Sequence, residues 1–120
     1  MELIIHTGRQ YKIAEVKAEG ITIYNVQDAL NILADANYND VHRIIIHEKN
    51  ISPDFFDLKT GLAGEILQKF VNYKKKLAVV GEFEKYNSKS FTSFRYECNR
   101  GNQFFFVGEI ETAITKLSCA

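Results

Sequence analysis

Hydrophobic and polar positions along this chain predict short strands that alternate with helices. Two apolar segments open the chain, and the second alternates apolar with charged residues, as a strand with one buried face does. A polar turn at residues 8–10 would join them as a hairpin. Three later runs are short, apolar and rich in Val, Ile, Leu or Phe, which is typical of strands buried on both faces. The predicted strands are residues 3–7, 11–16, 41–47, 77–80 and 103–107.

Between the later strands, apolar residues recur three or four positions apart, which predicts amphipathic helices. Asn25 and Ser88 stand where helix N-caps are expected, and Ser52-Pro53-Asp54 is typical of a first helical turn. The predicted helices begin near residues 25, 60, 88 and 109, with a short helical turn through 55–56.

This order of elements predicts one α/β domain over residues 1–120. The opening hairpin would form an antiparallel edge, and right-handed crossovers would make the remaining strands parallel. The length of 120 residues suits a single domain with one sheet and about four helices.

Charge composition argues against nucleic acid as a partner. Fifteen basic and 15 acidic residues give a net charge of zero, so no global positive field would attract a polyanion. The basic run at residues 74–76 is interpreted as a solvated helix end. The phenylalanines, Phe91 and Phe106 among them, are expected in the core rather than on a base-stacking surface.

Other motifs limit the remaining classes of function. No apolar run approaches the length of a membrane span, and the first residues do not resemble a signal peptide, so a cytoplasmic location is expected. Cys98 and Cys119 form no CxxC pair, and the histidines are scattered, so no metal site is expected. No cofactor is expected either, because the phosphate-binding and dinucleotide-binding fingerprints are lacking.

The segment before the second long helix gives the strongest indication of a functional surface. Gly61 and Gly64 stand at its start, although glycine within a helix costs about 1 kcal/mol relative to alanine. They favour a close approach, either of the first hairpin or of a ligand or partner. Thr60 is expected to cap the helix, and its hydroxyl could also be phosphorylated there, because free amides stabilise an anion.

The stretch Phe56-Asp57-Leu58-Lys59-Thr60-Gly61-Leu62-Ala63-Gly64 resembles the Phe-Ile-Asp-Ser-Ser/Thr-Gly-Leu-Gly signature of STAS domains. These domains occur in sulfate transporters and in anti-sigma-factor antagonists of bacterial partner switches. Residues 104–117 are similar to the closing strand and helix of the same fold. More closely, the chain is similar to the bacterial domain-of-unknown-function 4180 family, through residues 43–48, 57–73, 77–83 and 88–101.

The STAS resemblance implies a non-catalytic regulatory module that binds a protein partner. In STAS antagonists a partner kinase phosphorylates the Ser or Thr before Gly-Leu, and the matching residue here is Thr60. The sequence departs from the signature at Lys59, where a small hydroxyl residue would stand, and at the extra Leu58. The predicted interaction surface consists of Asp57, Lys59, Thr60, Gly61 and Gly64. A second copy of the chain, in a homodimer, is the other partner considered.

The alternative hypothesis is a small-molecule or enzymatic site. His47 and Glu48 follow a buried strand, where catalytic side chains often lie in α/β proteins. Together with Glu65 and the 57–60 segment, they could supply an acid, a base and a group that holds an anion. The competing structural interpretation is that His47 simply hydrogen-bonds to the loop that follows it.

Overall fold

The computed structural model describes residues 1–7 and 10–120, and in them it confirms the α/β fold. Gly8 and Arg9 of the predicted hairpin turn lie outside the described residues. The strands are β1 (Glu2–Thr7), β2 (Lys12–Lys17), β3 (Arg43–His47), β4 (Lys76–Val80) and β5 (Phe104–Val107). The helices are α1 (Val26–Tyr38), α2 (Leu62–Asn72), α3 (Lys89–Arg100) and α4 (Ile110–Cys119). Three single 3₁₀ turns, η1 (Glu48–Asn50), η2 (Pro53–Phe56) and η3 (Leu58–Thr60), connect β3 to α2.

Helices α1 and α3 begin where their predicted N-caps stand. The side chain of Asn25 accepts a hydrogen bond from the Asp28 amide at 2.9 Å, and Ser88 accepts one from the Phe91 amide at 3.1 Å. Each bond satisfies an amide that has no partner within its own helix. No helix among the described residues is long and apolar enough to cross a membrane.

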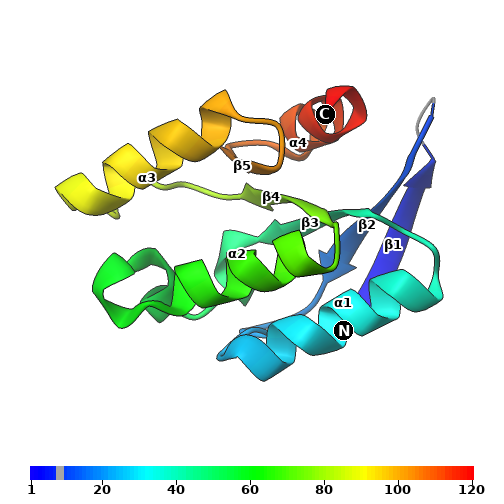
Figure 1. Ribbon diagram of the computed structural model, residues 1–120, viewed down its shortest axis with the longest axis horizontal. Helices are drawn as coiled ribbons and strands as arrows, with labels where there is room; N and C mark the ends of the chain where they lie inside the picture. Colours follow the sequence, from blue (N-terminus) through cyan, green and yellow to red (C-terminus); the bar gives the residue numbers. More distant parts are fainter. Residues whose placement is uncertain (8–9) are drawn as a thin grey trace.

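One mixed sheet carries the strands in the order β1-β2-β3-β4-β5 (Figure 1). β1 and β2 are antiparallel, in continuous register from Glu2 opposite Lys17 to Thr7 opposite Lys12. The other neighbouring strands are parallel, as the alternation of strands with helices predicts. The carboxyl ends of β3, β4 and β5 therefore meet at one edge of the sheet.

The helices cover the two faces of the sheet unequally. α1, α2 and α3 contribute to the hydrophobic cluster on one face, and α4 contributes to the cluster on the other. Figure 1 shows α1 and α2 on the opposite side of the strands from α4. α4 contacts β4 and β5, so it lies over the far half of its face from β1.

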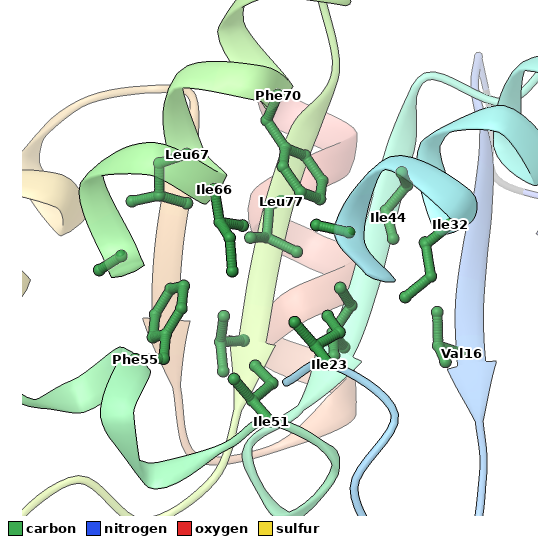
Figure 2. Packing of buried hydrophobic residues seen from close by; sticks show 14 of the residues in the cluster. Val16, Ile23, Ile32, Ile44, Ile51, Phe55, Ile66, Leu67, Phe70 and Leu77 are labelled. Atoms are coloured by element: carbon green, nitrogen blue, oxygen red, sulfur yellow. The ribbon is translucent and has the colours of Figure 1, made fainter. Parts of the chain in front are cut away.

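Alternate residues of the central strands supply both clusters. Ile44 and Ile46 pack toward α1 and α2, whereas Ile45 packs toward α4, so β3 is buried on both faces as predicted. Figure 2 shows the larger cluster, in which Ile66 and Phe70 of α2 pack over the strands. Phe91 and Phe106 are fully or almost fully buried within it, which confirms their place in the core.

The basic run at residues 74–76 is not the solvated helix end that the sequence indicated. Lys74 has a φ of 57°, and the Lys75 amide bonds back to the Phe70 carbonyl at 2.8 Å, which turns the chain sharply at the end of α2. Lys75 is consequently 1% exposed, and its Nζ lies 3.0 Å from Nδ1 of His42. Burial lowers the pKa of Lys75, and the charge of nearby Asp40 opposes that shift.

Arg43, at the start of β3, holds the end of α4 against the sheet. Its Nε donates to the Leu117 carbonyl at 2.7 Å and its Nη2 to the Ala120 carbonyl at 2.6 Å. The guanidinium carbon lies 3.4 Å from the centre of the Tyr11 ring. A cation at the carboxyl end of a helix complements the helix dipole, so this buried charge has a structural partner.

Candidate functional site

The segment from Asp57 to Gly61 forms a short capped loop that leads into α2. A carboxylate oxygen of Asp57 accepts a hydrogen bond from the Lys59 amide at 3.2 Å, which starts η3. The side chains of Asp57, Lys59 and Thr60 are exposed. The predicted interaction surface is therefore contiguous and open to solvent.

The hydroxyl of Thr60 connects three parts of this loop. It lies 2.7 Å from the Asp54 carbonyl and 2.9 Å from the Asp57 carbonyl, to which it can donate, and it accepts from the Leu62 amide at 3.2 Å. Thr60 thus joins η2 and η3 to the first turn of α2. Thr60 is not the N-cap of α2, as the sequence predicted, because Gly61 holds that position. Thr60 instead binds the first amide of the helix from the residue before the N-cap, and it remains exposed.

Gly61 and Gly64 have different reasons to be glycine. Gly61 lies just before α2 with a φ of 78°, a left-handed conformation that strains other residues. Gly64 lies within α2, and a Cβ placed there would meet no atom within 4 Å. Of the two alternatives, a close approach of the first hairpin to Gly64 is therefore wrong, and the approach of a ligand or partner stays a prediction.

Open space at Gly64 forms part of a shallow groove beside α2. The groove has a volume of about 570 Å³, and its lining includes Glu65 together with Val26 of α1 and Gln68 and Lys69 of α2. Glu65 is exposed at the first turn of α2, where an acidic side chain complements the helix dipole. Gly64 belongs both to this groove and to the predicted interaction surface, so the two share this residue.

His47 points away from this surface and joins a cluster on the face that α4 half covers. Nε2 of His47 lies 2.6 Å from one carboxylate oxygen of Glu15, and Nε2 of His6 lies 2.9 Å from the other. The ammonium of Lys17 lies 3.5 Å from the same carboxylate. His47 therefore bonds to a neighbouring strand rather than to the loop that follows it.

The Glu15 carboxylate is buried, with only 6% of its side chain exposed. Burial alone would raise its pKa, but hydrogen bonds from His47 and His6 and the charge of Lys17 outweigh this, so the pKa of Glu15 lies below its usual value. A carboxylate that accepts from Nε2 of an imidazole leaves Nδ1 of that ring as a base. The cluster can therefore hold or transfer a proton.

Glu48 belongs to a third, separate cluster at the carboxyl edge of the sheet. It accepts hydrogen bonds from the Tyr86 hydroxyl and from Lys85 Nζ, the latter at 2.9 Å. Burial raises the pKa of Glu48, and these two donors lower it by more. Burial and the Glu48 carboxylate together raise the pKa of Tyr86. Gly81 is required beside this cluster, because a Cβ there would overlap the side chain of Glu48.

A cavity of about 580 Å³ opens at the same edge, beyond the ends of β4 and β5. Its charged lining comes from Glu82, Glu84, Arg95 and Glu109. The 57–64 segment does not line it.

In the described residues, no hydrogen bond or ion pair joins His47 or Glu48 to Asp57, Lys59 or Thr60. No group of three His, Cys, Asp or Glu residues in that part of the chain is placed to hold a metal ion.

The sequence interpretation missed Glu15 and His6. The charged residues of the second strand were expected opposite its buried face and the histidines were described as scattered, but His6 and His47 converge on Glu15. One signal was present, because Glu15 is two residues from Ile13 and therefore shares its buried face.

Fold and site together define a small α/β-sheet protein with an exposed capped loop and a buried carboxylate–imidazole cluster. A family model described as "Domain of unknown function (DUF4180)" matches residues 8–117, so the chain belongs to this family, as its sequence indicated. Comparisons with curated proteins and with solved structures found no match.

Proposed function

We propose that this chain is a non-catalytic regulatory module that binds a protein partner through residues 57–64 and the adjoining groove at Gly64. The observation that carries the proposal is the Thr60 hydroxyl, which is on an exposed residue and yet connects η2, η3 and α2. A change at this one atom would alter the shape of the whole surface. The resemblance of this segment to the STAS signature supports the same assignment.

Phosphorylation of Thr60 would act on this surface in two ways. A phosphate ester has no hydroxyl proton, so the donation to the Asp54 and Asp57 carbonyls would be lost. The dianion would also be attracted to the first amides of α2 and to the ammonium of Lys59. The loop would rearrange toward the helix, and a partner bound to the unmodified surface would be released.

The proposed setting is the bacterial cytoplasm, where partner switches of the STAS type operate. A domain of this kind needs only local complementarity with its partner, which agrees with the net charge of zero. No cofactor takes part in the proposed function.

The test combines partner capture from the native host with binding measured on the purified pair. We expect Thr60→Glu to weaken binding by about tenfold or more, because it adds charge and removes the hydroxyl donor. Thr112→Glu adds the same charge on exposed α4 and should leave binding unchanged. Equal binding by wild type, Thr60→Glu and Thr60→Ala would refute the switch, as would phosphopeptide mapping that finds Thr60 unmodified under every growth condition tested.

The second candidate is an acid–base ligand site, which the sequence placed at His47, Glu48, Asp57, Lys59 and Thr60. The cluster of His6, Glu15 and His47 favours a version of it centred on His47 alone. A thermal-shift screen of small phosphates and carboxylates would detect such a ligand, and the shift should disappear in Glu15→Gln. A panel without any shift in the wild type would remove this candidate.

A further inference from the structure

β1 forms one border of the sheet. It pairs with β2 on one side, and in the described residues no strand pairs with its other side. Its outward backbone N–H and C=O groups are therefore available to another strand. Ile5 of this strand is 40% exposed, and Met1, which directly precedes the strand, is 57% exposed.

This edge lacks the features that usually prevent strand addition. β1 contains no lysine and no proline, and its register with β2 is unbroken, so no bulge twists the edge away. At six residues it is also longer than β5, the opposite border of the sheet, which has four. β1 is therefore the more favourable border for pairing with another chain.

Symmetry restricts how β1 could pair with a second copy of itself. Antiparallel pairing about a two-fold axis perpendicular to the sheet keeps each side chain on its own face. Residues opposite each other must then be separated by an even number of positions, and one residue lies opposite its own copy. Ile4 and Ile5 are the two central choices for that residue.

The side chains select Ile4. With Ile4 opposite itself, Leu3 lies opposite Ile5 of the second copy, and Glu2 lies opposite His6 of the second copy. The apolar pairs match, and a carboxylate faces an imidazole that can carry a positive charge. With Ile5 opposite itself, Leu3 would instead face Thr7 and Ile4 would face His6, so apolar residues would oppose polar ones.

His6 is available for this contact. Its Nε2 is used by Glu15 of its own chain, and its Nδ1 makes no hydrogen bond with any other described residue. Glu2 is exposed at the start of the same strand.

We propose that two copies of this chain join through β1, antiparallel and centred on Ile4, to form one continuous sheet. The two-fold axis keeps α4 of both copies on the same side of that sheet. The two clusters of His6, Glu15 and His47 then lie on this same face, on either side of the axis. This interface is distinct from the surface at residues 57–64.

Cysteine cross-linking tests the register directly. In a background with Cys98→Ser and Cys119→Ser, Ile4→Cys places two thiols opposite each other at the axis, and mild oxidation should give a covalent dimer. Ile5→Cys is the matched control and should cross-link poorly, because its partner in this register is Leu3. Cross-linking of Ile5→Cys in preference to Ile4→Cys would overturn the proposed register.

Sedimentation equilibrium tests the interface without cross-links. We expect the wild type to dimerise. Ile5→Lys should weaken the dimer about tenfold or more, because the two-fold interface contains each contact of Ile5 twice and both are lost. Tyr38→Lys on α1 replaces a side chain that is 90% exposed and should leave the dimer intact. A wild type that remains monomeric at high protein concentration, or a dimer that Ile5→Lys leaves unchanged, would overturn the proposal.

Discussion

Glu15, Glu48 and Lys75 are ionisable residues that are buried in the fold, and the side chain of each contacts a polar partner there. Glu15 lies between two imidazoles, Glu48 accepts from Tyr86 and Lys85, and Lys75 contacts His42. A buried charge is tolerated only where hydrogen bonds or opposite charges replace the lost water. These residues therefore depend on distant parts of the chain, and removing one partner should be costly.

The carboxylate of Glu15 should stabilise the fold in a pH-dependent way. Its pKa is lowered on folding, so its contribution is fully present above the unfolded value near 4.5 and is lost as the pH falls through the folded pKa. We expect Glu15→Gln to lower the free energy of unfolding by about 1–3 kcal/mol at pH 7, because a charged acceptor of two hydrogen bonds is replaced. The difference from wild type should shrink in strongly acidic solution.

Urea denaturation of wild type and Glu15→Gln at pH 7 and at pH 3 would measure this effect. Glu19→Gln removes an exposed carboxylate from the loop after β2 and should leave stability nearly unchanged at both pH values. A Glu15→Gln deficit that is the same at pH 7 and pH 3 would show that the carboxylate charge does not contribute.

At the scale of elements, local signals explain what could be predicted. Asn25 and Ser88 mark the helix starts because capping depends on residues only three positions apart. The apolar run at 44–46 predicts a central strand because burial on both faces removes alternation. The convergence of His6 on Glu15 depends on the β1–β2 register, and that of His47 on the pairing of β2 with β3, which no local pattern specifies.

The loop before α2 also combines a feature that the local sequence indicates with features that depend on the folded chain. Thr60 was expected to be the N-cap of the helix, but Gly61 holds that position and Thr60 binds the Leu62 amide from the residue before it. The separate roles of the two glycines were not predicted either, because φ at Gly61 and empty space at Gly64 are properties of the folded chain. The sequence also gave no sign that Lys75 turns inward, since that depends on the reversal at Lys74.

Gly61 and Gly64 should respond to alanine with opposite signs. Gly61→Ala places a Cβ in a left-handed conformation and should destabilise the protein by about 1–2 kcal/mol. Gly64→Ala meets open space within α2 and should stabilise it by about 0.5–1 kcal/mol. Thermal or urea denaturation measures both, and destabilisation by Gly64→Ala would mean that this position is more confined than the structure shows.

At the scale of the whole molecule, helices cover the two faces of the sheet to different extents. One face carries α1, α2 and α3, while α4 covers only part of the other face, over β4 and β5. The open part of that face, near β1 and β2, carries the polar cluster around Glu15 and adjoins the free edge of β1. The stability of that face therefore depends strongly on how α4 is held, and Arg43 provides the polar contacts that hold its end.

Arg43→Met should loosen α4 more than the rest of the fold. Methionine keeps much of the side-chain volume, but it cannot donate to the Leu117 and Ala120 carbonyls or place a cation over the Tyr11 ring. We expect the free energy of unfolding to fall by about 1–3 kcal/mol and amide exchange in α4 to accelerate relative to that in α1. Arg100→Met is the control, because the contacts of Arg100 with Glu97 and with the Tyr96 ring are both exposed, and its loss should change both quantities far less. If exchange in α4 and α1 accelerated equally, Arg43 would stabilise the fold as a whole, and the end of α4 would be held by its apolar contacts through Ala113 and Leu117.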